Sequence, residues 1–358
     1  MAICQLCCGQ IIISSGTSIV ANPRTTMITN TSIDNQSSIA DFSNIDLGLT
    51  GSTAPSLITS SPVTLRGLGI GGGSNWTLGG AWTITAALKL IKGNIIVPST
   101  STLTYTGTND IATGSINSYI NGQLFMQGSG SRTFPIGNAD GYFPVIFDKV
   151  TDATTSLGFE VIKGDPNFSS QKPLDVSDIF IDHYWQLTVN GGSFSGSPLE
   201  VSTLGTDTFL KGGTPGAPIV LELDTDNNLT NINGQYISPF VKVRNNTSPK
   251  GKIYALGKSE KVEVKVVNVI TPTGDDTRNN VLQISDIELF PENKVTLLDR
   301  YGVPVKTWTN FKNFDTTTTS QDGFDFASLG TGNYICIVEY SSSTGEKLKV
   351  SQMVTVLK

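Results

Sequence analysis

The sequence predicts an almost all-β protein, and three observations support this. Glycine is abundant, with 37 residues among 358, and together with the many Ser, Thr and Asn residues it disfavours helix interiors. The apolar residues are largely Ile, Val and Leu in short runs, which is typical of strands. Turn-forming residues separate these runs every few positions. The length allows two or three domains with enough chain to bury a core.

Charge and hydropathy exclude two classes of protein. The net charge is −6 and the pI is about 4.9, with Lys and Arg scattered singly along the chain. Because no basic stripe forms, we expect no nucleic-acid partner. The apolar runs are all far shorter than the roughly 20 residues that a membrane-spanning helix needs. The sequence therefore does not predict an integral helical membrane protein.

Residues 1–10 are interpreted as the remnant of an export signal. They are apolar and small but lack a positively charged start, so we expect a truncated signal and a mature chain that begins near Ile11. Cys4, Cys7 and Cys8 lie here, and Cys336 is the one cysteine that follows. A zinc site would need a fourth ligand and a folded frame. No disulfide framework can form beyond residue 8.

The segment 11–130 is predicted to be a β-rich, solenoid-like domain. Residues 1–130 hold only four of the 24 Lys and Arg residues and four of the 30 Asp and Glu residues, so this segment differs in kind from the remainder. Short strands with Gly, Asn and Ser at the corners favour a parallel β-solenoid. Because the runs show no regular period, an irregular β-sandwich remains the alternative. The runs are Thr25–Thr29, Val63–Leu65, Trp82–Leu90, Ile95–Val97 and Thr102–Tyr105.

The segment 131–268 is predicted to be an antiparallel β-sandwich. Its alternating runs are longer and are separated by explicit Gly, Asn, Asp and Pro turns, which suits roughly seven or eight strands. The expected strands include Tyr142–Phe147, Leu157–Ile162, His183–Val189, Ile219–Leu223 and Lys261–Val267.

The segment 269–358 is predicted to be a separate Ig-like β-sandwich. The expected strands are Lys294–Leu298, Val303–Trp308, Gly332–Tyr340 and Lys347–Leu357. Apolar residues that alternate with polar ones predict one buried face per strand. The residues expected on that face are Val295, Leu297, Ile335, Ile337, Val354 and Val356.

Two loop motifs imitate ligand sites. Residues 67–72 satisfy G-x-G-x-x-G, but the following residues 73–80 cannot start the helix that a phosphate-binding loop requires, so we interpret the motif as a glycine-rich corner. Residues 224–228 place three oxygen ligands at alternate positions. An EF-hand would then need Gly and Glu where Leu229 and Gln235 stand, and an Asx-rich turn is favoured over a calcium loop.

The sequence offers few residues for catalysis. His183 is the single histidine, and neighbouring Asp182 would point to the opposite face of the same strand, so the pair cannot converge directly. No G-x-S-x-G motif occurs. We predict no catalytic residue, no cofactor and no metal. Carbohydrate stacking on a tryptophan is weighed against a core role for Trp76, Trp82, Trp185 and Trp308.

Four short sequence blocks near the C-terminus occur in the order of the motifs of a known domain family. Residues 272–279 read P-T-G-D-D-T-R-N, residues 290–302 read F-P-E-N-K-V-T-L-L-D-R-Y-G, residues 332–336 read G-N-Y-I-C, and residues 353–358 read M-V-T-V-L-K. This order resembles the gliding motility-associated C-terminal domain, the type B sorting domain of proteins exported by the type IX secretion system of Bacteroidota. The resemblance covers about a quarter of the chain, and the middle block is its most specific part.

The resemblance also has departures. Thr273 and Asp276 stand where the family has Asn and Gly, which puts a cation-binding role of this turn in doubt, and residues 313–316 replace its W-D-G turn. The latter predicts a remodelled loop over residues 313–325. The resemblance implies export to the cell surface or the extracellular space, with the outer-membrane translocon and its β-barrel partner protein as partners. The sorting-motif residues that it implies are Pro272, Gly274, Asp275, Pro291, Asn293, Asp299, Arg300, Tyr301, Gly302, Gly332, Tyr334 and Lys358.

These observations together favour an exported, non-enzymatic cell-surface protein that acts in adhesion or surface assembly. A surface filament or a glycan would be its partner outside the cell. The alternative from another class is a secreted glycan-acting hydrolase or lyase that carries the same signal. A third candidate is a structural accessory that packs against a larger surface filament.

Overall fold

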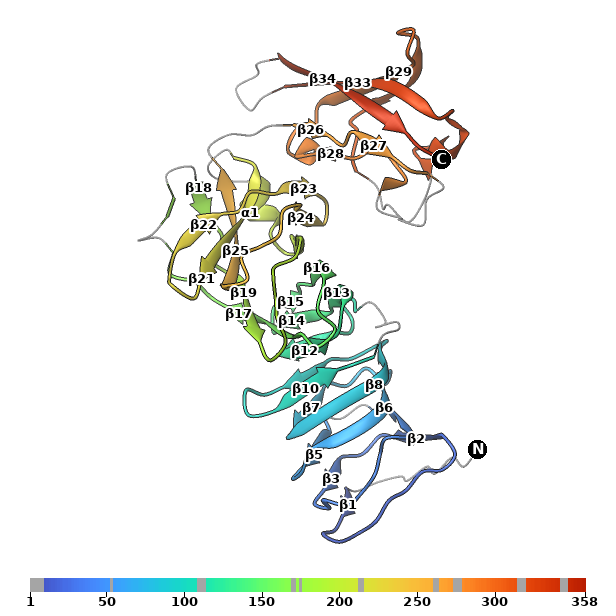
Figure 1. Cartoon of the computed structure of the whole chain (residues 1–358), viewed down its shortest axis with the longest axis vertical. Coiled ribbons are helices and arrows are strands. Elements are labelled where there is room, and N and C mark those ends of the chain that lie inside the picture. The colour runs from blue at the N-terminus through green and yellow to red at the C-terminus, as the bar shows by residue number, and fades with distance from the viewer. Residues whose placement is uncertain are drawn as a thin grey trace.

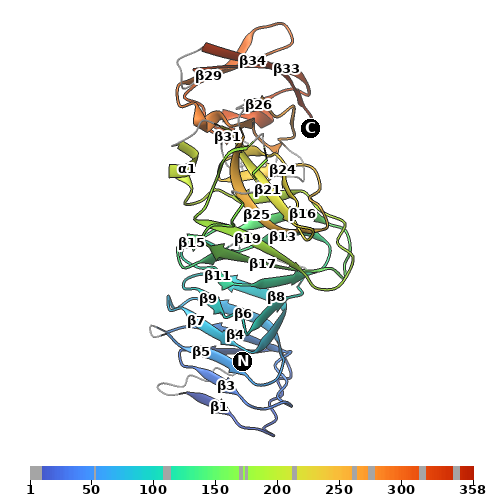
Figure 2. The same cartoon turned by 90° about the vertical axis from the view of Figure 1, so that its left-hand side faces the viewer.

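The computed structural model describes most of the chain and confirms an all-β protein. The described residues are 10–51, 54–107, 114–168, 172–173, 176–211, 216–259, 264–272, 279–313, 320–341 and 347–358, so residues 1–9 with their three cysteines lie outside them. Among these residues the single α-helix is α1 (Asp207–Lys211). No described helix is long and apolar enough to cross a membrane. Figures 1 and 2 show an elongated molecule whose N-terminal and C-terminal parts lie at opposite ends.

The N-terminal part is a two-sided parallel β-solenoid of about five turns, as the sequence favoured. The chain alternates between two sheets, and each strand pairs in parallel with the equivalent strand one turn later. The first sheet contains β1 (Ile11–Ile13), β3 (Ile33–Asn35), β5 (Ser56–Thr59), β7 (Trp76–Gly79), β9 (Ile95–Val97) and β11 (Ile120–Gly122). The second contains β2 (Thr25–Thr29), β4 (Ile45–Leu49), β6 (Val63–Ile70), β8 (Ala81–Leu90), β10 (Thr102–Tyr105) and β12 (Leu124–Gln127).

Stacked apolar side chains fill the solenoid interior. Leu47 pairs with Leu68, and Leu68 with Leu88, so one column of buried leucines runs through three turns. The turns differ in length: Val63 pairs with Trp82, 19 positions on, whereas Ile95 pairs with Ile120, 25 positions on. This variation explains why the sequence shows no regular period.

The central part continues the second solenoid sheet with antiparallel strands. β12 pairs in parallel with β10 but antiparallel with β17, so β17 covers the last solenoid turn in this sheet. The sheet then extends through β19, β25, β21 and β22, with β18 also on β25. The bounds are β17 (Ser156–Lys163), β18 (Val176–Ile179), β19 (His183–Val189), β21 (Pro218–Asp224), β22 (Leu229–Asn231) and β25 (Gly251–Ser259).

A five-stranded antiparallel sheet packs against this extension. Phe159 of the extension contacts Phe134 and Phe147 of the five-stranded sheet, with ring centroids 4.9 and 5.3 Å apart. The strands of the five-stranded sheet are β13 (Gly130–Phe134), β16 (Val145–Val150), β20 (Leu199–Ser202), β24 (Phe240–Val243) and β23 (Gln235–Ile237). One hydrophobic core runs from Ile13 to Leu256 and joins the solenoid to these sheets.

Two expected central strands differ from the structure. The run Tyr142–Phe147 is split between β15 (Gly141–Tyr142), which pairs with β14 (Ile136–Asn138), and β16. The interruption contains Pro144, which lacks the N–H that a ladder needs. Of the run Lys261–Val267, residues 261–263 lie outside the described part, and β26 covers Lys265–Val266.

The C-terminal part has its own core. β27 (Val269–Ile270), β34 (Lys347–Val356), β33 (Gly332–Ser341), β29 (Asn293–Leu298) and β30 (Pro304–Thr309) form its main sheet, hereafter the C-terminal sheet. One face of this sheet packs on a separate core that also includes Val264 and Val266. The smaller elements are β26, β28 (Ile284–Ser285), β31 (Ser320–Gln321), β32 (Phe324–Asp325) and the 3₁₀ turns η3 (Ile287–Leu289) and η4 (Phe326–Ser328).

The predicted buried face of β33 is wrong by one residue. Val295, Leu297, Val354 and Val356 are fully buried as expected, but Ile335 is 37% exposed and Ile337 is half-buried. The buried side chains are instead Cys336, Val338 and Tyr340. At the centre of this strand both alternating sets are apolar, Ile335 and Ile337 in one and Cys336 and Val338 in the other, so these residues alone did not distinguish the two faces.

Candidate functional site

The central motif block builds the β29–β30 hairpin of the C-terminal sheet. Buried Asn293 fixes the start of β29, since its Nδ2 donates to the carbonyls of Phe290 and Phe311 at 2.7 and 3.0 Å. Its Oδ1 accepts from the Phe311 N–H at 2.8 Å. Exposed Pro291 lies two positions before it. The asparagine therefore ties the two ends of the hairpin together and leaves no polar atom of its side chain unpaired.

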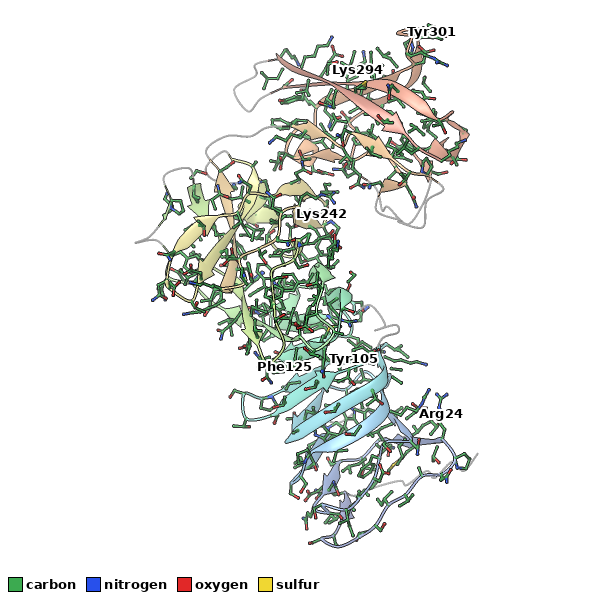
Figure 3. The ribbon with its side chains drawn as sticks, in the orientation of Figure 1. Arg24, Tyr105, Phe125, Lys242, Lys294 and Tyr301 are labelled. Atoms are coloured by element: carbon green, nitrogen blue, oxygen red, sulfur yellow. The ribbon has the colours of Figure 1, made fainter. Side chains whose placement is uncertain are left out.

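The tip of this hairpin is a preorganised turn. Asp299 Oδ1 accepts from the N–H groups of Tyr301 and Val303 at 2.8 and 2.9 Å. Gly302 has φ +82°, a conformation that costs glycine little. The Arg300 guanidinium lies 5.4 Å from the centre of the Tyr301 ring, whose side chain is 79% exposed. Figure 3 shows Tyr301 at the end of the molecule remote from the solenoid.

The other predicted motif residues are distributed over the domain. Pro272 is buried, Gly332 begins β33, and exposed Lys358 follows β34. The Tyr334 hydroxyl donates to the Gly330 carbonyl at 3.0 Å. Gly274 and Asp275 lie outside the described residues. The motif thus holds turns and strand ends in place and does not converge on one catalytic point within the described part.

Sequence reasoning missed the role of Asn313, which stands where the family has its W-D-G turn. Its Oδ1 accepts from the Ile284 N–H at 2.7 Å, and its Nδ2 donates to the Ile284 carbonyl at 2.6 Å. Its own N–H donates to Glu288 Oε1 at 2.9 Å. The amide side chain thus pairs with β28 as a backbone peptide would. Residues 314–319 of the predicted remodelled loop lie outside the described part.

The comparison with protein families identifies this domain. Residues 264–356 match the family model of the CHU_C Type IX secretion signal domain. The C-terminal domain is a type IX secretion signal domain. The match begins at Val264, where the separate core also begins. Searches of curated proteins and of solved structures gave no match. The chain is exported by the type IX secretion machinery, with which the signal domain interacts, to the cell surface or the extracellular space.

Outside the signal domain, the two loop motifs that resemble ligand sites, residues 67–72 and 224–228, are parts of the β-structure. The G-x-G-x-x-G stretch begins within β6, and a Cβ on Gly72 would lie 2.3 Å from the Gly51 nitrogen. Asp224 Oδ1 accepts from the N–H groups of Asp226 and Asn228 at 2.9 and 2.8 Å, as in an Asx turn. Among the described residues, no three His, Cys, Asp or Glu side chains form a group suited to a metal ion.

The single histidine lies in an aromatic cluster. His183 is 3% exposed, stacks on Phe143 with ring centroids 3.9 Å apart, and meets Phe180 and Trp185 edge-on at 4.8 and 5.0 Å. Asp182 is exposed in the bend that precedes β19. The tryptophans Trp76, Trp82, Trp185 and Trp308 are all buried, so none offers a free ring to a sugar.

The solenoid presents a polar flat surface, here called the threonine face. Thr64, Thr83 and Thr104 are neighbours on β6, β8 and β10, and Thr85 and Thr102 lie on the same side of that sheet. Their side chains are exposed or half-buried. Beside this face, Asp46 forms ion pairs with Arg24 and Arg66, the latter at 2.8 Å.

Proposed function

We propose that the exported chain is a non-enzymatic surface protein whose solenoid acts in adhesion or surface assembly. The observation that carries this proposal is the threonine face. Strands about 4.8 Å apart and same-side residues about 6.6 Å apart along a strand give a rigid grid of hydroxyl groups. Each hydroxyl can donate and accept hydrogen bonds. Such a grid suits weak, repeated contacts with the hydroxyl groups of a glycan.

Many weak contacts gain strength when several copies bind one surface. A net hydrogen bond contributes about 1 kcal/mol, so a few hydroxyl contacts give little affinity in a single chain. Copies displayed together on a cell surface would raise the apparent affinity by avidity. His183 is buried, and the Asp224 carboxylate accepts a hydrogen bond within its own turn, so both side chains are engaged in the structure. This supports a binding role over a hydrolytic one.

The first experiment tests the threonine face. The full chain carrying Thr64→Val, Thr83→Val and Thr104→Val keeps the β-branched shape but loses three hydroxyl groups. We expect binding on a glycan array or to whole cells to fall at least about tenfold. The control is Thr77→Val, an exposed threonine of β7 in the other solenoid sheet. Equal binding by the two variants, or product release from a polysaccharide, would refute the proposal.

For export we propose that the signal domain engages the outer-membrane translocon together with its β-barrel partner protein. The signal domain has its own core, so its removal leaves the core of the solenoid and central sheets complete. We expect a chain lacking residues 264–358 to accumulate in the periplasm. Fractionation followed by immunoblotting measures this, and surface display of the shortened chain at normal levels would contradict it.

A further inference from the structure

The outer face of the C-terminal sheet collects exposed apolar side chains. Elsewhere, large exposed apolar residues are spread over the solenoid and the central sheets. In the signal domain, the described residues include six large exposed apolar side chains. Five of them lie at one end of the C-terminal sheet, and Leu357 is the sixth. Clustering of this kind marks interaction sites, whereas scattered apolar residues need no explanation. The five are Tyr301 at 79%, Val303 at 57%, Val305 at 37%, Ile335 at 37% and Met353 at 56% exposure.

The strand register joins these residues into one band. Leu298 pairs with Ile335, and Ile335 pairs with Met353, across three adjacent strands. Their sequence neighbours Leu297, Cys336 and Val354 are fully buried on the inner face. Because side chains alternate between faces, the three pairing residues face outward. We call Leu298, Val305, Ile335 and Met353, with Tyr301 and Val303 at the hairpin tip, the apolar band.

Basic side chains lie on the same face as the apolar band, separated from it by one row of outward-facing residues, Thr296, Ile337 and Ser351. Lys294 and Lys349 share one carboxylate, Glu339, at 3.8 Å each, which leaves a net positive charge on that side. Figure 3 shows Lys294 in the outermost layer of the domain. At the tip, Arg300 lies over the Tyr301 ring and forms no ion pair with a described carboxylate, while the carboxylate of Asp299 is turned to the backbone N–H groups of the turn. A partner with an acidic rim would complement this surface, whereas a second copy of the same face would be repelled.

The edges of the sheet are poorly suited to strand addition. The edge strand β30 contains Pro304 and Lys306 and is bulged where it pairs with β29, and all three features block pairing with another strand. The opposite edge strand, β27, has two residues. The face of the sheet, rather than its edge, is therefore the surface open to a partner.

We propose that the apolar band docks onto a protein of the outer-membrane export machinery that presents an apolar patch with an acidic rim. The proposal deepens the export role above and rests on it. Tyr, Met and Arg are enriched at protein interfaces, whereas Lys and Glu are depleted there. The band, with Tyr301, Met353 and the neighbouring Arg300, has this composition. A lipid-inserting surface would instead present Trp, Phe and Leu.

The experiment places two carboxylates in the band of the full chain. Ile335→Glu with Met353→Glu should lower the exported fraction at least about tenfold, because docking would then bury two carboxylates in an apolar contact. The control is Asn333→Glu with Ser351→Glu, which adds the same charges to the same outer face of the same strands. The control variant should be exported within about twofold of the parent chain, as expected for exposed positions.

Further measurements separate the outcomes. Resistance of the signal domain to limited proteolysis reports whether each variant keeps the signal-domain core, and Val305→Glu alone serves if the double variant unfolds. The purified parent chain should bind outer-membrane vesicles from cells with the translocon and not vesicles from cells lacking it. The variant with Ile335→Glu and Met353→Glu should bind neither. Normal export of the band variant would overturn the docking surface but not the signal function, which fails only if the chain lacking residues 264–358 is exported.

Two results would assign the band to another occupant and overturn the proposal. One is that the parent chain, but not the variant with Ile335→Glu and Met353→Glu, floats with vesicles of phosphatidylcholine and phosphatidylglycerol, which would indicate a lipid surface. The other is that the parent chain, but not this variant, forms a dimer in sedimentation velocity.

Discussion

His183 links the stability of the central sheets to pH. The ring is surrounded by Phe143, Phe180 and Trp185, and its Nε2 has no hydrogen-bond partner among the described residues. Burial lowers the pKa of His183 from 6.5 to about 4, and the negative charge of Asp140 opposes this only partly. The folded state therefore favours the neutral ring.

We predict that the protein loses stability on acidification between pH 6.5 and about 4. Over this range the unfolded chain binds a proton at His183 that the folded chain does not bind. The expected loss is about 3 kcal/mol, complete near pH 4. His183→Phe keeps an aromatic ring and should remove this part of the pH dependence. Urea unfolding at several pH values measures the effect, and parallel stability curves for both proteins would contradict it.

The sequence placed Asp182 and His183 on opposite faces of one strand. In the structure β19 begins at His183, and Asp182 is exposed in the bend before it. The depth of burial could not be predicted, because Phe143 lies some forty positions earlier and reaches the histidine through sheet packing. At the hairpin tip, likewise, the motif identified Asp299 and Gly302, but the exposure of the apolar band depends on strand pairing.

At the scale of elements, each solenoid turn depends on its inward side chains. Ile84 of β8 is fully buried and pairs with Leu65 on one side and Tyr105 on the other. Ile84→Ala should lower the free energy of unfolding by about 2–5 kcal/mol, because it leaves a cavity between rigid strands. Thr85→Ala at the next, exposed position should change it by about 0.5 kcal/mol or less. Chemical denaturation of the two variants decides this, and a similar loss in both would contradict it.

Strand positions were easier to predict than strand partners. Thr25–Thr29, Ile95–Val97, Thr102–Tyr105 and His183–Val189 coincide with observed strands, because local alternation and turn residues define them. The partners depend on turn lengths, which vary between solenoid turns, so the sequence left a sandwich open as the alternative. In β33 even the face was wrong, since Ile335 and Cys336 are both apolar.

At the scale of the whole molecule, the change in charge density near residue 130 does not mark a break in packing. β12 of the solenoid and β17 of the central sheets are neighbours in one sheet, and Phe125 lies against Gly158 across that junction, where a Cβ would come within 2.6 Å of its ring. One core continues through both parts. Composition reports the solvent-facing residues, and these change even where the buried ones do not.

The signal domain, in contrast, meets the central sheets at a polar contact. The Asp286 N–H donates to the Tyr236 carbonyl of β23 at 3.0 Å. Asp286 is 3% exposed, and its Oδ1 has no hydrogen-bond partner in the described structure. Burial, reinforced by the nearby Glu288 carboxylate, raises the pKa of Asp286 well above its usual range. A hydrogen bond from the Tyr236 backbone, the charge of Lys265 and a hydrogen bond from Ser285 oppose this shift only partly. A buried carboxylate with one oxygen left without a partner therefore costs free energy at this contact when it is charged.

We predict that Asp286→Asn strengthens the contact at neutral pH. The raised pKa means that the carboxyl group stabilises the folded contact most below about pH 4, and that this stability is lost as pH rises towards the raised value. Asparagine removes the charge and tolerates the φ of +60° found here. Amide hydrogen exchange around Tyr236 and Asp286, corrected for its intrinsic pH dependence, should be slower at pH 7 in the variant, and the difference should vanish near pH 4. Faster exchange at pH 7 would show instead that the carboxylate holds the two parts together, through a charge partner such as Lys265.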